Sequence, residues 1–362
     1  MKGRYMTSPA PAPKIPQLWV PLPSGIHPGW REIDERSAVW LDRFGLYSDR
    51  AQRERLMRIS VGEITSRGAP AGRPAALQWT SDFLMWLFAF DDEFCDEGPV
   101  AASPDATLLI ITKLQRIVEV PWAAPADDSY SAALRELRLR LDHLTTPVQT
   151  ARWAASFRAY LQGQIWMAAN SAHGRIPSLS DHLAVRLDSS GVKIFSTLSE
   201  IIHGYDLPAA DYERHDIRGF VEVFASIIGW SNDLISYHKE RQRSQDSFGN
   251  IIDLIAYERK CSLDEAVSET AMMHTRAMTL YLRLRDQILR DAGSELRRWI
   301  TDCDSWIRAD YDWSLTTSRY VNPEDPADLP AGSAASPFRE READHPLPIP
   351  SVAWWWTLLK DQ

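Results

Sequence analysis

The chain has 362 residues, 44% of them hydrophobic, and its formal net charge at pH 7 is −9. This length allows one large domain or two ordinary ones. The negative charge argues against nucleic acid or an anionic membrane surface as a partner, because both would repel the chain. No apolar run approaches the roughly 20 residues of a membrane span. Three cysteines without metal-ligand spacing indicate a reducing compartment, so we expect a cytoplasmic protein.

The predicted secondary-structure elements are all helices. Residues 1–28 are rich in proline and predict an extended N-terminal arm. Helical patterning begins near Trp30, and Ser262-Leu-Asp-Glu265 is a capping box that marks a later helix start. No segment alternates with a period of two, so no sheet is expected. Further helices are expected over approximately 49–64, 75–97, 104–118, 130–144, 147–172, 178–203, 211–240, 262–290 and 294–320.

No break in composition divides the helical part of the chain. We therefore predict one all-α domain over residues 29–320. Residues 321–362 are again rich in proline, glycine, alanine and serine, yet they end in Trp354-Trp355-Trp356. Three consecutive tryptophans are too apolar to remain in water, so this tail is expected to pack back on the domain.

An acidic stretch directly follows the apolar segment 83–90. Asp91 and Asp92 begin it, and Asp96 lies four residues after Asp92, so two or three carboxylates can converge at the rim of an apolar wall. No lysine or arginine occurs between Arg73 and Lys113 to neutralise them. Oxygen clusters of this kind suit Mg²⁺. The alternative is a solvated acidic helix end.

A second group of oxygen ligands lies on the expected helix 211–240. Asn232, Ser236 and Glu240 are spaced i, i+4 and i+8, which drifts by only about 80° around an α-helix. An amide oxygen, a hydroxyl and a carboxylate on one face can share one cation. A solvated polar face is the alternative, but the apolar residues before the triad favour a metal site that faces an apolar cavity.

Cationic groups follow in two places. Arg186 begins a segment in which residues 189–191, Ser-Ser-Gly, interrupt the helical pattern, and Arg319-Tyr320 closes the last expected helix. Arginine offers a bidentate fork for phosphate, and tyrosine adds a hydroxyl donor. An arginine at a helix end is more often a surface charge. Each of these two segments therefore indicates a phosphate-binding site only in combination with the metal motifs.

These motifs together resemble a known family. Asp91-Asp92-xxx-Asp96 is similar to the aspartate-rich motif of class I terpene synthases, and the triad on 232–240, with Lys239 before the glutamate, resembles the bacterial form of their second metal motif. Arg319-Tyr320 resembles the arginine–tyrosine pair of the bacterial enzymes. The order and spacing agree over about residues 25–360, with most likeness to bacterial selinadiene-type sesquiterpene synthases.

The resemblance implies a single-domain class I terpenoid-synthase helical bundle around a central apolar cavity. It implies Mg²⁺ as cofactor, typically three ions, held by Asp91, Asp92, Asp96, Asn232, Ser236 and Glu240. It implies that the diphosphate is bound by Arg186, Lys239, Arg319 and Tyr320, and that Arg186, Ser189 and Ser190 act in catalysis as diphosphate sensor, linker and effector. Aromatic faces stabilise carbocations, and the expected wall residues are Phe83, Trp86, Phe88, Phe90 and Trp313.

The implied reaction is that of a lyase in isoprenoid biosynthesis: ionisation of a linear prenyl diphosphate and cyclisation to a sesquiterpene hydrocarbon or alcohol. Farnesyl diphosphate is the first expected substrate, and geranylgeranyl diphosphate, used by diterpene synthases, is the main alternative. A chain-elongating prenyltransferase would need a second aspartate-rich motif. An all-α Mg²⁺-dependent nucleotide pyrophosphatase and a non-catalytic helical scaffold are the remaining alternatives. A homodimer is common among relatives.

The polar segment from Arg241 to Asn250 follows the triad directly. We expect it to become ordered over the site when diphosphate and metal bind, because its polar groups then gain an anionic partner. Amide hydrogen exchange measured with and without a diphosphate analogue and Mg²⁺ tests this, with slower exchange expected in the complex. Unchanged exchange across the segment would count against it.

Overall fold

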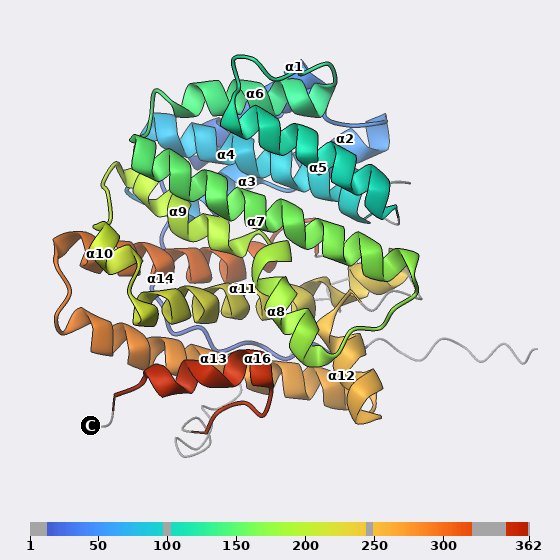
Figure 1. The fold of residues 1–362 in the computed structure, drawn as a ribbon, viewed down its shortest axis with the longest axis vertical. Helices are drawn as coiled ribbons and strands as arrows, with labels where there is room; N and C mark the ends of the chain where they lie inside the picture. The colour runs from blue at the N-terminus through green and yellow to red at the C-terminus, as the bar shows by residue number, and fades with distance from the viewer. Residues whose placement is uncertain (1–12, 97–102, 244–248, 321–344, 361–362) are drawn as a thin grey trace, which may run out of the picture.

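The structure is a computed structural model that describes residues 13–96, 103–243, 249–320 and 345–360. Within these ranges all regular structure is helical and no strand occurs. Figure 1 shows the helices stacked in rows, with α11 (His215–Arg243) running between α14 (Ser294–Ser314) above it and α13 (Leu263–Leu289) below it. The prediction of an all-α fold is confirmed.

In the first half of the chain, α4 (Pro74–Phe90) packs among the surrounding helices. In chain order the other helices here are α1 (Trp30–Phe44), α2 (Arg50–Met57), α3 (Val61–Gly68), α5 (Pro104–Glu119), α6 (Ser129–Leu141) and α7 (Pro147–Ala172). The second half contains α8 (Leu179–Ser189), α9 (Val192–His203), α10 (Ala209–Tyr212), α12 (Ile251–Arg259), α16 (Pro350–Ala353) and the 3₁₀ turn η3 (Trp354–Leu358), besides α11, α13 and α14. No helix in the described ranges is long and apolar enough to cross a membrane.

Several expected helix boundaries are wrong. The predicted helix 49–64 is divided into α2 and α3, because Ser60 takes a left-handed backbone conformation with φ 58° that ends the helical hydrogen-bond ladder. The predicted helix 211–240 instead begins at His215, after the separate short helix α10. The last long helix ends at Ser314 and not near Tyr320, so residues 315–320 form turns.

The predicted break after Arg186 is present. α8 ends at Ser189, and Gly191, with φ 72°, begins α9. A side chain at that φ would be strained, which is why glycine stands there. The break also lies very close to α7, since a Cβ added at Gly163 would come within 2.8 Å of Ser189.

The acidic stretch continues α4 in a different helical form. Residues Asp91–Asp96 form the π-helix η1. Its i→i+5 hydrogen bonds widen the turn, so the α-helical spacing expected for Asp92 and Asp96 does not apply. The side chain of Asp96, Glu97 and residues 244–248 of the expected lid lie outside the described residues.

Both ends of the chain contact the helical body. From the N-terminal arm, Leu18 and Leu22 are buried, and Arg308 of α14 donates a hydrogen bond to the carbonyl of Val20. From the tail, the Trp355 indole donates to Glu222 of α11 at 2.8 Å, and its ring lies 6.2 Å from that of Trp230. Burying these apolar side chains stabilises the fold by roughly 1.5–3 kcal/mol each.

A buried ion pair joins α7 to α9. Arg152 donates to Glu200 at 2.6 Å, and the backbone N–H of Leu207 donates to the same carboxylate at 2.7 Å. Glu200 is fully buried. The pKa of its carboxyl is raised by burial, and the Leu207 hydrogen bond and Arg152 oppose that rise.

Replacing Arg152 with leucine is expected to lower the free energy of unfolding by about 3–5 kcal/mol, because the Glu200 carboxylate would stay buried without its charge partner. Denaturant unfolding followed by circular dichroism measures the change. The matched control is Arg50→Ala, which breaks an exposed ion pair with Glu54 and should cost about 1 kcal/mol or less. Equal losses in the two variants would contradict the prediction.

Candidate active site

The acidic side of the site lies where α4 passes into η1. Asp92 is buried, and its Oδ1 lies 3.0 Å from a guanidinium nitrogen of Arg319. The same nitrogen lies 3.6 Å from Oδ2 of Asp91. Burial raises the pKa of the Asp91 carboxyl, Arg319 lowers it, and Asp92 raises it further. A buried carboxylate such as that of Asp92, with Asp91 beside it, requires compensating positive charge.

The predicted second metal motif lies on α11. The Ser236 hydroxyl donates to Glu240, so two of its three predicted oxygen ligands are in contact. Asn232 lies one turn before Ser236 and presents its amide to the groups around Arg186 and Tyr320. The three side chains therefore lie along one face of the helix.

Tyr320 and Arg319 connect the two metal motifs. The Asn232 amide donates to the Tyr320 hydroxyl at 2.7 Å, while Arg319, the preceding residue, contacts Asp91 and Asp92. Burial raises the pKa of Tyr320 to about 12, so its hydroxyl stays protonated and available as a donor. Lys239 lies 5.8 Å from the Tyr320 ring. The turn that follows α14 thus contacts both motifs, one through Arg319 and the other through Tyr320.

Arg186 reaches the same place from α8. Its guanidinium donates to Oδ1 of Asn232 at 3.1 Å and forms an ion pair with Asp233. Burial works against its charge, but Asp233, Glu240 and Asp91 together hold the pKa of Arg186 above its usual range. All four predicted diphosphate-binding residues therefore lie around the metal motifs. Ser189 and Ser190 lie at the adjacent helix break.

Two residues of this network were not expected from the sequence. Asp233 is buried beside Arg186, and burial raises the pKa of its carboxyl to about 6. Asn250 donates to Glu240 at 2.9 Å and to the backbone carbonyl of Asp233 at 2.8 Å. An asparagine directly before an apolar helical segment is an N-cap signal, and Asn250 does cap α12. For Asp233, the sequence signal that could have revealed it is a charged residue among the apolar residues of α11.

The predicted aromatic residues divide between two environments. Phe88 and Trp313 lie beside the cationic groups: Arg319 lies 4.8 Å from the Phe88 ring, and Trp313 lies 5.6 Å from both Phe88 and Tyr320. Phe83, Trp86 and Phe90 lie on another face of α4. Phe83 and Trp86 pack edge-on against Phe157 of α7, and Phe90 stacks on Trp86.

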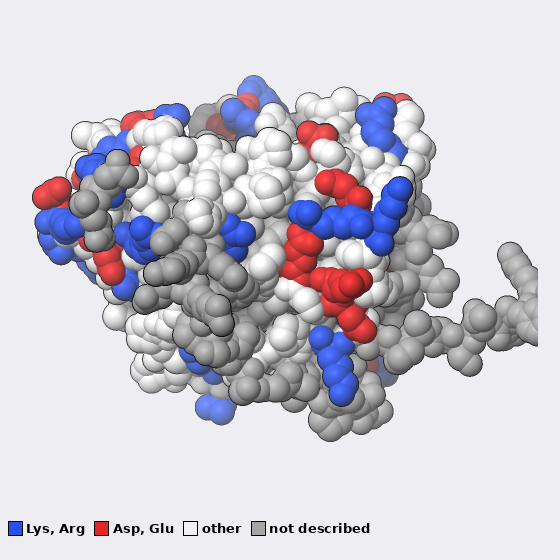
Figure 2. Space-filling view, turned by 90° about the horizontal axis from the view of Figure 1, so that it is seen from below, with Lys and Arg blue, Asp and Glu red and all other residues white. Residues whose placement is uncertain are grey.

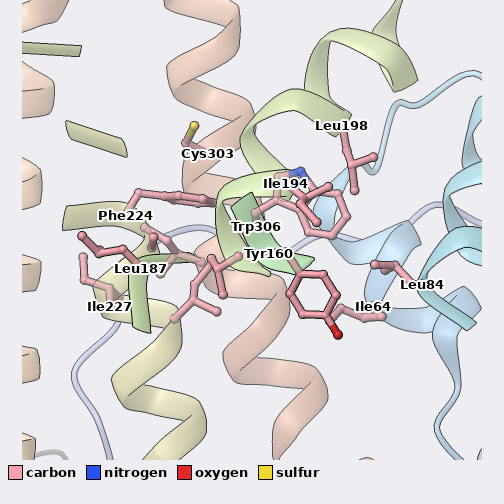
Figure 3. Close-up of a cluster of buried hydrophobic side chains, with 14 of the residues drawn as sticks. Ile64, Leu84, Tyr160, Leu187, Ile194, Leu198, Phe224, Ile227, Cys303 and Trp306 are labelled. Atoms are coloured by element: carbon pink, nitrogen blue, oxygen red, sulfur yellow. The ribbon is translucent and has the colours of Figure 1, made fainter. Parts of the chain in front are cut away.

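A central apolar cluster lies among the helices. Figure 3 shows side chains converging from α3, α4, α7, α8, α9, α11 and α14, including Leu84, Tyr160, Phe224 and Trp306. A hollow of about 550 Å³ lies elsewhere, lined by Glu93, Phe94, Lys113 and Tyr130 among others. On the face shown in Figure 2, acidic side chains gather right of centre beside basic ones, further charged side chains lie at the left edge, and uncharged surface lies between them.

The residues present fit a hard divalent cation. Their ligand atoms are carboxylate, amide and hydroxyl oxygens, which is the set that Mg²⁺ accepts. Desolvation raises the pKa of the Asp91 carboxyl, and a bound cation would offset that cost. The predicted ligands therefore fit Mg²⁺ by the chemistry of their donor atoms.

Comparison with known proteins agrees with this geometry. A family model described as terpene synthase family 2, C-terminal metal binding, matches residues 82–279. A protein of Streptomyces pratensis named (+)-(1(10)E,4E,6S,7R)-germacradien-6-ol synthase is 87% identical over 98% of this chain and 100% of its own length. Bonnadiene synthase of Allokutzneria albata is 34% identical over 94% and 97% of the two chains. The crystal structure of the SVS_A2 protein from ancestral sequence reconstruction superposes with a TM-score of 0.84 at 30% identity, over 95% of this chain and 100% of that one.

The fold and the two facing metal motifs define a class I terpenoid synthase. The chain belongs to the terpene synthase family, and it is a lyase that depends on a divalent metal. The predictions of family, fold class and enzymatic activity are confirmed, and the non-catalytic scaffold and the nucleotide pyrophosphatase are set aside.

Replacing Asn250 with alanine is expected to weaken metal-dependent binding of inorganic diphosphate by about 10–100-fold, because Asn250 orients Glu240. Isothermal titration calorimetry with Mg²⁺ and diphosphate measures the affinity. The variant also loses the N-cap of α12, at about 1 kcal/mol. Ser262→Ala removes the N-cap of α13, has no contact with Glu240 among the hydrogen bonds of the described residues, and controls for that loss. Equal diphosphate affinity in the two variants would argue against the role of Asn250.

Proposed function

We propose that the protein binds farnesyl diphosphate with Mg²⁺, ionises its C–O bond and cyclises the resulting cation to a sesquiterpene alcohol. The observation that carries this proposal is the continuous set of contacts from Asp92 through Arg319 and Tyr320 to Asn232 and Arg186. These contacts bring metal ligands and anion-binding groups from four segments of the chain to one place.

Recognition of the diphosphate is the task of the cationic groups. Arg186 and Arg319 carry guanidinium forks suited to phosphate oxygens. In the structure they are paired with Asp233 and Asp92, so the fold already holds them in position. Lys239 adds a third charge, and the Tyr320 hydroxyl adds a neutral donor. The anion is thereby attracted locally by a protein whose net charge of −9 repels it overall.

Ionisation follows from stabilising the leaving group. When bound, Mg²⁺, which we propose as three ions held by Asp91, Asp92, Asp96, Asn232, Ser236 and Glu240, supplies positive charge to the departing diphosphate. Arg186, with Ser189 and Ser190 at the helix break, is proposed to sense the diphosphate and bring the backbone of the break toward the substrate. These donors favour C–O cleavage because they bind the diphosphate more strongly as its charge develops.

The cation then needs a site without water or strong nucleophiles. Phe88 and Trp313 lie next to the diphosphate groups, where their ring faces can stabilise positive charge by about 0.5–2 kcal/mol each. Phe83, Trp86 and Phe90 are proposed to support this wall through their packing. The central apolar cluster is proposed as the surface that folds the isoprenoid chain.

An alcohol is the proposed product for a specific reason. The relative that is 87% identical is named a germacradien-6-ol synthase, and an alcohol arises when water captures the final cation.

We also retain as proposals a cytoplasmic location, a homodimer, and the division into an arm over 1–28, a domain over 29–320 and a tail over 321–362. Leu109 and Trp122, which are 73% and 72% exposed, offer apolar surface to a second copy.

Purified protein incubated with farnesyl diphosphate and Mg²⁺ is expected to form a cyclic C15 alcohol, detected by gas chromatography–mass spectrometry. Product should be absent with EDTA and fall at least about 100-fold in Asp91→Ala and Asn232→Ala, because each removes a metal ligand. Glu54→Ala, which removes an exposed carboxylate of α2, should retain full activity. Turnover of geranylgeranyl diphosphate alone would favour the diterpene alternative.

A further inference from the structure

A buried carboxyl group on α14 has no assigned role in the site above. Asp310 is 5% exposed, and its Oδ2 has no hydrogen-bond partner among the residues that the structure describes. Four further polar atoms on the same helix share this condition, and two of them, the Oγ of Ser314 and the indole Nε1 of Trp306, lie on the same face as Asp310. Buried polar atoms without partners are rare in folded proteins and each requires an explanation.

These three side chains lie along one face of α14. Trp306, Asp310 and Ser314 are spaced i, i+4 and i+8, so they stack over successive turns. Side chains four residues apart have Cβ atoms about 5–6 Å apart. A single water molecule, with hydrogen bonds of about 2.8 Å to each side, spans that distance. A buried water needs two or more polar partners, and Asp310 and Ser314 supply two.

The position of Asp310 lies between the two halves of the proposed active site. Trp306, one turn before it, belongs to the central apolar cluster in Figure 3. Trp313, three residues after it, contacts Phe88 and Tyr320 beside the diphosphate-binding groups. The carboxyl group therefore stands where the isoprenoid chain would pass from its diphosphate end into the apolar cluster.

We propose that Asp310, with Ser314, is a positioning residue that holds the water molecule which captures the final carbocation. This inference rests on the proposed function. The water oxygen donates a lone pair to form the C–O bond to the cationic carbon. One O–H bond of the resulting oxonium then breaks, its electron pair stays on oxygen, and the proton passes to the diphosphate released at ionisation. The alcohol and protonated diphosphate account for all atoms and charges.

The burial of Asp310 is consistent with this role. Desolvation raises the pKa of its carboxyl to about 8, so the group is mainly protonated at neutral pH. A neutral carboxyl can hydrogen-bond water, but it does not add to a carbocation as a carboxylate nucleophile would. The site can thus retain a polar group in an apolar surround without losing the cation to a covalent adduct.

The test compares product ratios in full-length variants. Asp310→Leu removes the hydrogen-bonding group, and the ratio of alcohol to cyclic hydrocarbon is expected to fall at least tenfold while diphosphate release stays within about threefold. Asp310→Asn retains a group that hydrogen-bonds water and should keep the ratio within about twofold. Wild-type turnover in H₂¹⁸O should label the alcohol oxygen. An unchanged ratio in Asp310→Leu, or an unlabelled alcohol, would overturn the proposal.

The matched control is Asp302→Asn, a buried carboxyl on the same helix that already has partners. Asp302 accepts from the Tyr205 hydroxyl at 2.7 Å and lies 3.2 Å from His203. This variant should change stability but not the product ratio. If Asp310→Leu fails to fold, a crystal structure of the wild-type enzyme decides: a water bonded to Asp310 and Ser314 supports the proposal, and its absence contradicts it. A wild-type enzyme without any Mg²⁺-dependent C15 product would instead refute the proposed function, and one that forms only hydrocarbon would overturn the role of Asp310.

Discussion

The contact between Arg319 and the carboxylates of Asp91 and Asp92 is the interaction on which the site depends. Two adjacent carboxylates at the end of an apolar helix repel each other and lose hydration, so they need a nearby cation. Arg319 supplies that charge at 3.0 Å from Asp92. Because Tyr320 follows it and bonds to Asn232, the same short turn fixes the distance between α4 and α11. Metal binding and anion binding are therefore properties of one network.

Interruptions of the helices occur next to the residues of this network. The π-helical end of α4, the break between α8 and α9, and the turns after α14 all occur where site residues lie. A continuous α-helix satisfies its own backbone groups and points its side chains at fixed angles. Departures from it free backbone polar groups and redirect side chains. The break after Arg186 was predicted, whereas the π-helical form of η1 and the end of the last long helix at Ser314 were not.

The interior separates charge from apolar surface along α14. Tyr320 and Arg319 follow its C-terminal end, Trp313 lies at the last turn, and Trp306 lies in the central apolar cluster. An ionised diphosphate and a carbocation need these different surroundings within one site. Asp310 is the exception within the apolar stretch, and its unpartnered oxygen suggests a specific use for water in a reaction that otherwise excludes it.

The sequence by itself determined the helical class, because periodicity is a local property of the chain, and its motifs carried the resemblance to the family. Asn232, Ser236 and Glu240 could be assigned to one helix face without any tertiary information. The pairing of Arg186 with Asp233, the reach of Asn250 to Glu240 and the isolation of Asp310 were decided only by the tertiary structure. These features depend on which side chains distant helices bring together and on how much water the packing excludes. Neither is encoded in the spacing of any one segment.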